Sequence, residues 1–570
     1  MEKKFWQQQY TRDVPNTINP DMFSSLVHLF EKYADDFSDR PVFTNFGVSI
    51  TYHDMKIAIR DFAAFLQNEL NLKPGSRIAM MMPNILQYPI AIFGALKAGL
   101  IVVNINPLYT ASELAYQLND AEAETIVVLE NFADHLEAAL PNIKIKHIVV
   151  TKIGDMLGLL KGAVYNFAAK YVERRIPKYH LPHAVFFKKA LEIGKNSGYT
   201  LIALKNEDTA FLQYTGGTTG RSKGAVLTHR NIIANVLQCV SWIHDVKEQN
   251  HGVLIGALPL YHIFSLTVCG MCIFPMGASA LLITNPRDTH AFVKALRRCK
   301  MTMMIGLNTL FNAMMNHPDF EKIDFSFLKL TISGGMPMQK AVADRWQALT
   351  GVPVLEGYGL TESSPVLTLC PISATHFLGS VGLPVPSTEM VIRDEKQHDL
   401  ALNQTGEIWA RGPQVMKGYW HADRETHDAI DEAGWLRTGD IGYMDEKGFV
   451  FIVDRKKDMV LVSGFNVYPN EVEAVIASHP AVELVAVIGV PCEKTGEALK
   501  AFIVRRDTRL TKAELIDFCR QSLTGYKIPR FIEFRDQLPV SPVGKVLRRE
   551  LRDAEKKLMN HCAESLTQGT

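Results

Sequence analysis

Short apolar runs rich in β-branched residues alternate with helical patterns, and this alternation constrains the fold of the chain most. Four such runs are RIAMMMP (77–83), LIVVNINP (100–107), TIVVLE (125–130) and HIVVT (147–151). Between the first two, the segment NILQYPIAIFGALKAG (84–99) has a helical pattern. Strands that alternate with helices predict parallel sheets covered by helices on both faces. We therefore expect an α/β fold built from parallel sheets layered with helices.

The chain has 570 residues, too many for one hydrophobic core, so two or more domains are expected. Strand-like runs separated by turn residues predict a small β-subdomain at about 380–456. The charged stretch DRKKDM (454–459) indicates a domain boundary. We expect a large N-terminal domain over 1–456 and a compact α+β C-terminal domain over 457–570. In the latter, helices are expected to begin at Pro469, Thr511 and Pro542, and strands at 482–490 and 501–506.

One segment, residues 252–286, carries no charged side chain and is long enough to cross a bilayer. Pro259, Tyr261, His262 and Pro275 interrupt it, however. We therefore expect a strand, a loop, a helix and a second strand buried in a sheet. The N-terminal sequence MEKKFWQQQYTRDVP has no apolar run, so we do not expect a secretory signal.

Charge and cysteine usage exclude several classes of protein. The net charge of +1 argues against a nucleic-acid binder, which usually carries a clear basic excess. The chain has eight cysteines, and its one short-range pair, Cys269 and Cys272, has no second pair nearby. A structural zinc site or a disulfide scaffold is therefore not expected. Buried thiols in a reducing compartment, and hence a cytoplasmic location, are the better interpretation. The other cysteines are Cys239, Cys299, Cys370, Cys492, Cys519 and Cys562.

Residues 152–189 are basic and aromatic. Eight basic residues stand against Asp155 and Glu173. A solvated surface helix and loop is one interpretation of this region, and docking on an anionic membrane surface is the other. The basic residues are Lys152, Lys161, Lys170, Arg174, Arg175, Lys178, Lys188 and Lys189, and the apolar residues between them are Leu157, Leu159, Leu160, Phe167, Tyr171, Phe186 and Phe187.

The segment YTGGTTGRSKG (214–224) has the composition of a phosphate-binding loop. Its glycines let backbone N–H groups approach an anion, its hydroxyls add donors, and Lys223 adds a positive charge. It fails the nucleotide-hydrolase pattern, which requires Gly directly before Lys and a hydroxyl directly after it. Here Ser222 precedes the lysine and Gly224 follows it. Ordinary turns share this composition, so the loop alone does not decide the chemistry.

Four further motifs point to one kind of site. EGYGLTES (356–363) places a ring, a hydroxyl and a carboxylate in one loop, and SGGMP (333–337) is expected to be a turn at a strand end. GWLRTGD (434–440) ends in an aspartate that precedes the arginine of DRKKD. SPVGKVLRREL (541–551) places a lysine after a glycine, ahead of a basic helix.

Together, and in this order, these motifs resemble the adenylate-forming superfamily of acyl-CoA synthetases, firefly luciferase and peptide-synthetase adenylation domains. The resemblance covers essentially the whole chain. Within it, residues 434–459 resemble the fatty-acyl-CoA synthetase signature. The resemblance also implies that the C-terminal domain rotates between two half-reactions.

The resemblance implies an acid–thiol ligase that makes long-chain acyl-CoA. Such an enzyme joins a fatty acid to ATP, giving acyl-AMP and pyrophosphate, and then transfers the acyl group to coenzyme A. An aryl- or medium-chain acid–CoA ligase is an alternative, as is an acyl-AMP ligase that passes its product to a carrier protein. A fatty-acid binding or uptake protein without catalysis is an alternative of another class.

The resemblance also assigns site residues. ATP or AMP is expected to contact Tyr214, Thr215, Gly216, Gly217, Thr218, Thr219, Gly220, Lys223, Gly335, Glu356, Gly357, Tyr358, Gly359, Thr361, Asp440 and Arg455. The expected catalytic residues are Lys545, His262 and Glu362. Mg²⁺ is expected at Glu362 and Thr215, because this cation prefers oxygen ligands and bridges phosphates. Coenzyme A is expected at Gly464 and Phe465, and the hinge at Lys457. The acyl pocket is expected at Met303, Met304, Gly306 and Gly334, in segments that also hold Asn308, Thr309 and Gly335.

Each assignment has a structural alternative. Glu362 fits a helix cap, Tyr358 fits simple packing, and Asp440 with Arg455 fits a structural ion pair. The lysine at 545 is alternatively one more charge on a basic helix, and His262 a satisfied buried histidine. The residues of the acyl pocket are alternatively ordinary core.

The expected partners are therefore a fatty acid, ATP and coenzyme A, with Mg²⁺ and without nucleic acid. The expected location is the cytoplasm, with peripheral association at the inner face of the membrane left open. A homodimer is likewise an arrangement that the sequence leaves open.

Overall fold

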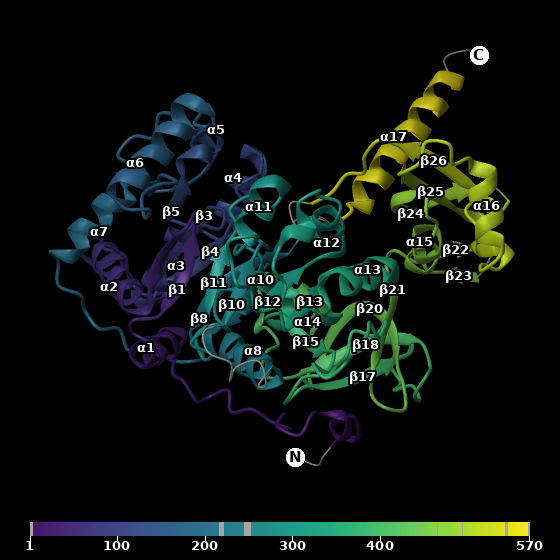
Figure 1. Ribbon diagram of the computed structural model, residues 1–570, viewed down its shortest axis with the longest axis horizontal. Coiled ribbons are helices and arrows are strands. Elements are labelled where there is room, and N and C mark those ends of the chain that lie inside the picture. The colour runs from purple at the N-terminus through teal and green to yellow at the C-terminus, as the bar shows by residue number, and fades with distance from the viewer. Residues whose placement is uncertain are drawn as a thin grey trace.

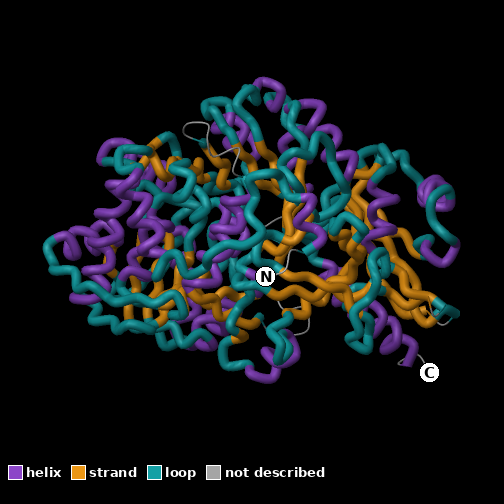
Figure 2. Tube along the Cα trace, turned by 90° about the horizontal axis from the view of Figure 1, so that it is seen from below, coloured by secondary structure: helices purple, strands orange, loops and turns teal. Residues whose placement is uncertain are grey.

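The computed structural model describes residues 4–215, 222–243, 252–463, 465–492, 494–541 and 545–567. Three sheets with their helices form the larger part of the molecule, and a fourth sheet with its helices lies to one side of it (Figure 1). In much of the larger part, strands lie between helices (Figure 2). The expected α/β architecture of parallel sheets layered with helices is confirmed.

An eight-stranded sheet holds the four strands expected from the alternating pattern. Its strand order is β19-β9-β8-β4-β3-β5-β6-β7, with parallel pairing except where β9 joins β8 and β19. The strands are β3 (Arg77–Met81), β4 (Ile101–Asn104), β5 (Thr125–Leu129), β6 (His147–Thr151), β7 (Val185–Phe186), β8 (Thr209–Thr215), β9 (Lys223–Thr228) and β19 (Gly418–Tyr419).

Both faces of this sheet are buried because its side chains alternate between two cores. Ile78 packs in one core and its neighbour Ala79 in the other. The helices of the first face are α2 (Tyr52–Asn68), α3 (Gln87–Lys97) and α7 (Phe187–Lys195), and those of the second are α4 (Ala111–Asp120) and α5 (Ala133–Ala139).

A nine-stranded sheet lies beside the first, with the order β16-β15-β14-β13-β12-β10-β11-β1-β2. Its strands are β1 (Pro41–Asn45), β2 (Val48–Thr51), β10 (Val253–Gly256), β11 (Ser279–Leu282), β12 (Met303–Gly306), β13 (Leu330–Gly334), β14 (Val354–Gly359), β15 (Val366–Leu369) and β16 (Leu383–Pro384). Its helices are α1 (Leu26–Asp36), α8 (His229–Trp242), α10 (Ile263–Val268), α11 (Thr289–Leu296), α12 (Asn308–Met315) and α13 (Lys340–Thr350).

The uncharged segment 252–286 forms β10, α10 and β11, so the expected strand, loop, helix and strand are confirmed. Among the described residues, no helix is both long and apolar enough to span a membrane. Five of the cysteines are buried as expected, but Cys299 and Cys492 are partly exposed, which corrects the expectation for these two.

A four-stranded antiparallel sheet follows, in the order β17-β18-β20-β21. The strands are β17 (Glu389–Arg393), β18 (Gly406–Arg411), β20 (Leu436–Met444) and β21 (Val450–Arg455), accompanied by α14 (Asp423–Ala429). Strand β16, which falls inside the range expected for the β-subdomain, pairs instead with β15 of the nine-stranded sheet.

The C-terminal elements form a five-stranded sheet packed with three helices. The strands are β22 (Val460–Val462), β23 (Phe465–Val467), β24 (Val482–Cys492), β25 (Gly496–Arg505) and β26 (Phe531–Arg535), and the helices are α15 (Pro469–Ala477), α16 (Lys512–Arg520) and α17 (Arg548–Thr567). We call these elements the C-terminal unit. Helix α15 begins at Pro469 as expected, and Thr511 caps α16.

The last helix begins later than the sequence predicts, at Arg548 rather than Pro542. The residues before it bond to the preceding segment. The N–H of Ser541 donates to the carbonyl of Lys545, and the N–H of Leu547 donates to the carbonyl of Pro539. These bonds hold Lys545 in a loop ahead of the helix. The lysine is therefore not one more charge on a basic helix.

Candidate active site

The predicted phosphate-binding loop lies at the end of a β-hairpin formed by β8 and β9. Thr215 and Lys223 are opposite each other in the register of the two strands. The hydroxyl of Tyr116 on α4 donates to the carbonyl of Ser222, 2.9 Å away, and so fixes one side of the hairpin end. Of the predicted loop residues, Gly216, Gly217, Thr218, Thr219 and Gly220 lie outside the described residues.

Tyr214 supports the base of this hairpin. Its hydroxyl donates to Asp120 Oδ2 over 2.6 Å. Burial, and then the carboxylate of Asp120, raise the pKa of Tyr214 above its ordinary value. A Cβ at Gly224 would lie 3.1 Å from the Tyr214 ring, so the glycine lets the two strands pack closely. The side chain of Tyr214 therefore stabilises the base of the hairpin.

A second group of residues meets the hairpin from β19 and from the short helix η6 (Thr361–Ser363), which packs against β8 and β9. The hydroxyl of Tyr419 donates to Glu362 Oε1, 2.7 Å away. Lys223 Nζ lies 5.3 Å from the centre of the Tyr419 ring and 3.9 Å from Glu425 Oε1. Because the Glu362 carboxylate bonds Tyr419, the structure does not use its side chain as a helix cap. The predicted residues Thr215, Lys223, Thr361 and Glu362 are thus brought together.

Tyr419 is a residue of this site that no sequence motif indicated. Its hydroxyl orients the Glu362 carboxylate, and burial followed by the Glu362 charge raises its pKa. Strand β19 has two residues, too few for a periodic pattern to show. The residue reaches the site only because β19 pairs with β9.

The residues at Glu362 fit a magnesium ion of the kind expected. Magnesium usually takes one or two carboxylates, together with water and substrate phosphates, rather than a full protein cage. Within the described ranges, no group of three or more His, Cys, Asp or Glu residues is arranged to hold a metal. One carboxylate of Glu362 with the hydroxyl of Thr215 matches that sparse donor set.

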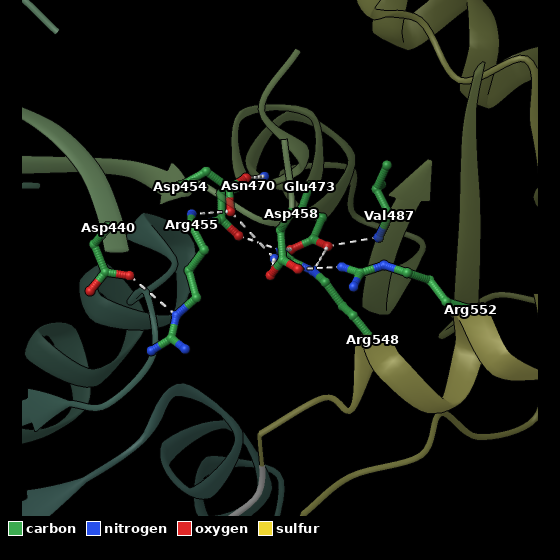
Figure 3. Close-up of polar contacts among 9 residues, drawn as sticks. All are labelled: Asp440, Asp454, Arg455, Asp458, Asn470, Glu473, Val487, Arg548 and Arg552. Carbon is green, nitrogen blue, oxygen red and sulfur yellow. Dashed lines mark hydrogen bonds and ion pairs between the residues drawn. The ribbon is translucent and has the colours of Figure 1, made fainter. Parts of the chain in front are cut away.

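The end of β14 meets the β20–β21 hairpin. Tyr358 donates its hydroxyl to Asp440 Oδ2, 2.7 Å away. Asp440 is buried, and its Oδ1 lies 3.2 Å from Arg455 Nε. Asp440 and Arg455 are register partners of β20 and β21, so the ion pair follows from the strand pairing (Figure 3). The three predicted residues therefore form one group.

Glycines at the end of β14 and in the SGGMP turn permit close backbone contacts. A Cβ at Gly359 would lie 1.8 Å from the carbonyl oxygen of Pro365, and one at Gly357 would lie 2.6 Å from Leu369. Gly335 follows β13 with a φ of +81°, a conformation that favours glycine.

Glu356 lies beneath this turn, and both of its polar groups have partners. Its Oε1 accepts from the N–H of Met338 over 3.1 Å, and its carbonyl accepts from Cys370 over 2.9 Å. Burial raises the pKa of Glu356 to about 8. The residue thus ties the turn to β14 and β15.

Lys545 reaches the N-terminal part of the site from the C-terminal unit. Burial lowers the pKa of Lys545 to about 8, the charge of Arg455 acts in the same direction, and Asp440 opposes both. Its backbone N–H donates to Ser541 Oγ over 3.1 Å. The lysine is thus close enough to Asp440 and Arg455 for their charges to act on it.

His262 lies at the start of α10, where its Nδ1 accepts from the N–H of Phe264 over 3.4 Å. The residue as a whole is exposed to solvent, which disfavours the alternative of a satisfied buried histidine. The surrounding protein nevertheless lowers the pKa of His262 to about 4, and the charge of Lys545 adds to that effect. His262 is therefore neutral at physiological pH and lies near Lys545.

The predicted acyl-pocket residues divide between two faces of the nine-stranded sheet. Met303 and Met304 are consecutive in β12, so they point to opposite faces and pack in different cores. A Cβ at Gly306 would meet the Phe311 ring at 2.7 Å, and one at Gly334 would meet Phe264 at 3.1 Å. A single pocket is therefore lined by at most one of the two methionines. Gly334 packs against Phe264, two residues after His262.

The predicted hinge and coenzyme A residues lie in the last part of the chain. Lys457 follows β21 in a turn, and the surrounding protein lowers its pKa to about 8. Phe465 is 55% exposed, and its ring stacks on Tyr526 with centres 4.7 Å apart. Gly464 lies outside the described residues. In this arrangement the Phe465 ring therefore packs on Tyr526 and does not join Lys545 and Asp440 in one site.

Comparisons with known proteins agree with this site. The family described as "AMP-binding enzyme" matches residues 30–420, and "AMP-binding enzyme C-terminal domain" matches residues 471–545. A protein of Yersinia pestis named "Long-chain-fatty-acid--CoA ligase" is 52% identical over 98% of this chain and 99% of its own length. A protein of the same name from Bacillus subtilis is 38% identical over 98% and 99%.

Among solved structures, ATP-bound MatB from Rhodopseudomonas palustris superposes with a TM-score of 0.79 at 27% identity, covering 93% of this chain and 99% of MatB. The two family matches cover the part of the chain that holds Lys223 and Glu362 and the part that ends at Lys545. On this evidence the chain belongs to the AMP-binding enzyme family.

Proposed function

We propose that the chain is an ATP-dependent long-chain-fatty-acid–CoA ligase. It joins a fatty acid to AMP with release of pyrophosphate, and then transfers the acyl group to coenzyme A. The observation that carries the proposal is that Lys545, which comes with the C-terminal unit, lies within the electrostatic influence of the Asp440–Arg455 ion pair. Two relatives named as long-chain-fatty-acid–CoA ligases match over nearly their full length at 52% and 38% identity. They support a long-chain fatty acid as the acid substrate.

In the first half-reaction a carboxylate must approach the α-phosphate of ATP, so charge neutralisation dominates catalysis. The hairpin end with Thr215 and Lys223 binds the β- and γ-phosphates. The carboxylate of Asp440 accepts the ribose hydroxyls, Arg455 adds a contact there, and the Tyr358 ring offers a face to adenine. Tyr358 and Arg455 already hold Asp440 in place, which reduces the ordering that the nucleotide requires.

Lys545 supplies the mobile positive charge. With a pKa of about 8 it is mostly an ammonium at neutral pH, and bound anions favour that form further. The ammonium donates to the fatty-acid carboxylate and to the α-phosphate, the two groups that carry charge as the acyl–phosphate bond forms. Neutral His262 lies beside them and orients the carboxylate without adding a second charge.

Glu362 and Thr215 would hold Mg²⁺, which supplies charge neutralisation to the phosphates when bound. Tyr419 orients the Glu362 carboxylate for this role through its 2.7 Å hydrogen bond.

For the second half-reaction we propose a rotation of residues 457–570 about Lys457. This rotation places the boundary between the two domains at residues 456 and 457. It withdraws Lys545 and brings the start of β23 at Phe465 to the acyl-AMP. The absence of a side chain at Gly464 leaves room there for the pantetheine arm of coenzyme A.

The test is a coupled assay of AMP formation across a series of fatty-acid lengths, with palmitate, octanoate and coumarate compared with and without coenzyme A. The proposal predicts pyrophosphate release with palmitate and palmitoyl-CoA as product. Preference for coumarate or octanoate would favour an aryl or medium-chain ligase. Product that stays as acyl-AMP would favour transfer to a carrier protein. No acid-dependent pyrophosphate release would favour a binding protein.

We further propose peripheral association with an anionic membrane surface through α6 (Leu159–Phe167) and the helical turn Ala168–Val172 that continues it. Seven apolar side chains are exposed on this segment and on β7: Leu159 (88%), Leu160 (87%), Val164 (64%), Phe167 (60%), Tyr171 (59%), Val172 (70%) and Phe186 (46%). Two apolar residues counted with this region from sequence, Leu157 and Phe187, are buried in the core instead.

Charge supports this surface. Asp155 is buried and accepts from Thr151 and the N–H of Lys152, while Glu173 pairs with Arg175 over 3.2 Å. The remaining exposed charge is therefore basic. Exposed apolar side chains rimmed by lysine and arginine suit the interface of an anionic bilayer. A long fatty acid partitions into the same interface, so this surface would place the enzyme near its substrate.

Cosedimentation with vesicles of phosphatidylglycerol and phosphatidylcholine tests this proposal. The double variant Leu159→Glu, Leu160→Glu should lose binding, whereas Leu201→Glu, at an 81% exposed leucine outside the segment, should retain it. Equal binding of both variants would contradict the proposed surface. Light scattering of the same samples without vesicles tests the homodimer.

A further inference from the structure

A largely buried cluster of charged side chains lies at the start of α17, where Arg548 follows the loop that carries Lys545 (Figure 3). Arg548, three residues after the lysine, donates from Nε to Glu473 Oε1 over 3.0 Å and from Nη2 to Glu473 Oε2 over 2.6 Å. Arg552 pairs with Asp458. These residues all follow Lys457, so the bonds among them join α15, α17 and the hinge segment into one body.

Asp454 is the exception, because it precedes Lys457. It lies in β21, and its side chain is fully buried. Asp454 Oδ2 accepts from the N–H of Asn470 over 2.8 Å, and its Oδ1 lies 3.5 Å from Arg548 Nη1. Both of these partners belong to the C-terminal unit, whereas a third, the N–H of Arg455, donates to Oδ1 from the same side of Lys457 as Asp454.

The contact with Asn470 is at the first turn of α15. This helix lacks a side-chain cap from its own N-cap residue, Tyr468. The Asp454 carboxylate therefore satisfies one of the free N–H groups at the positive end of the helix. A helix of the C-terminal unit is thus capped by a residue on the other side of the proposed hinge.

We propose that Asp454 and Arg548 are positioning residues for the first half-reaction. Their contact holds the C-terminal unit in the orientation that places Lys545 at Asp440 and His262. This inference rests on the proposed function and on the hinge at Lys457. Rotation about that residue moves Asn470 and Arg548 relative to Asp454. The carboxylate then loses both partners, so these contacts belong to the adenylating orientation and not to the other.

The bidentate pair of Arg548 with Glu473 differs from the Asp454 contact because it does not change during the rotation. Both residues follow Lys457, so their bonds persist through the rotation. They fix the direction of α17 and hence of the loop that carries Lys545. Arg548 contacts both Glu473 and Asp454. Its side chain therefore connects the loop that carries Lys545 to the segment before the hinge.

The experiment measures the two half-reactions separately in Asp454→Asn. Acid-dependent ATP–pyrophosphate exchange should fall about tenfold or more, because the charged carboxylate that holds Asn470 and Arg548 is lost. Thioester formation from supplied acyl-AMP and coenzyme A should stay unchanged or become faster. Asp553→Asn is the matched control, since Asp553 is an exposed carboxylate on α17 that pairs only weakly with Arg549, at 3.6 Å. It should alter neither rate.

Arg548→Lys changes the second residue of the same contact. It replaces the first variant in the experiment if Asp454→Asn does not fold. It should show the same selective loss, and the double variant should lose less than the sum of the two. Equal loss of both half-reactions, or no loss in either, would overturn the inference. Wild-type protein without acid-dependent exchange would instead contradict the proposed function itself, so the two failures are distinguishable.

Discussion

Lys545 is held by its backbone and not by its side chain. Its N–H and carbonyl both bond to Ser541, and none of its side-chain atoms has a hydrogen bond or ion pair in the described part of the chain. Lys545→Ala should therefore leave the fold intact. It should slow acyl-AMP formation at least ~100-fold, which is a usual loss when one preorganised electrostatic group is removed. Pyrophosphate exchange and the melting temperature check the two statements.

Lys556→Ala is the control for this prediction, because Lys556 is an exposed lysine on α17, the helix that follows the loop of Lys545. It should change neither quantity. A drop in melting temperature for Lys545→Ala as large as its loss of activity would contradict the assignment.

The same residue predicts a pH dependence. Burial lowers the pKa of Lys545 to about 8, so the ammonium is lost as pH rises through that value. The kcat/KM for adenylation should be flat below pH 8 and fall about tenfold per pH unit above it. His262, with a pKa of about 4, does not titrate in this range. In Lys545→Arg the fall should disappear, because a guanidinium stays charged. A fall that persists in that variant would belong to another group.

At the scale of elements, the pairing of β14 with β15 requires a glycine at 359. A Cβ there would lie 1.8 Å from the carbonyl oxygen of Pro365. Gly359→Ala must therefore push the strands apart and shift the neighbouring Tyr358 away from Asp440. We expect a loss of stability of about 1–3 kcal/mol or more, together with weaker AMP binding. Thermal unfolding and calorimetric titration with AMP measure these effects.

Gly525→Ala serves as the comparison, since nothing lies within 4 Å of an added Cβ at that position. Its melting temperature and AMP affinity should match those of the wild type. Normal AMP affinity in Gly359→Ala would show that the end of β14 does not position the nucleotide residues.

Elements made by local sequence were predictable, and contacts made by distant strands were not. The loop at 214–224 is a hairpin end, so the residues that would meet a phosphate are neighbours in sequence, and composition alone indicated them. The Tyr419–Glu362 bond joins residues 57 positions apart through a two-residue strand, and no local pattern announces it.

The acyl pocket and the last helix show the same limit. Strand period fixes Met303 and Met304 on opposite faces, but the resemblance assigned them as a pair to one pocket. Helix α17 begins at Arg548 because the preceding residues bond to Pro539 and Ser541, and helix-start residues alone do not reveal such a bond.

At the scale of the whole molecule, two parts of the chain share one site, and one of them must turn for both half-reactions to occur. Polar contacts between described residues cross the proposed pivot. Asp454 contacts Asn470 and Arg548, and Lys545 lies near Asp440. Polar contacts of this kind are replaceable by water, so a rotation does not have to break an apolar interface.

Lys457→Pro tests whether this rotation is required. Proline fixes φ near −65° and so removes the backbone freedom on which a pivot depends. Because Lys545 already lies at Asp440 in the present orientation, the variant should still form acyl-AMP in a first turnover. Its thioester formation should fall by at least about tenfold, since a hinge residue acts on the conformational step, and acyl-AMP should accumulate on the protein. Lys457→Ala, which keeps backbone freedom, should lose neither activity. Quenched-flow separation of acyl-AMP from acyl-CoA measures both steps, and unimpaired acyl-CoA production by Lys457→Pro would place the pivot elsewhere.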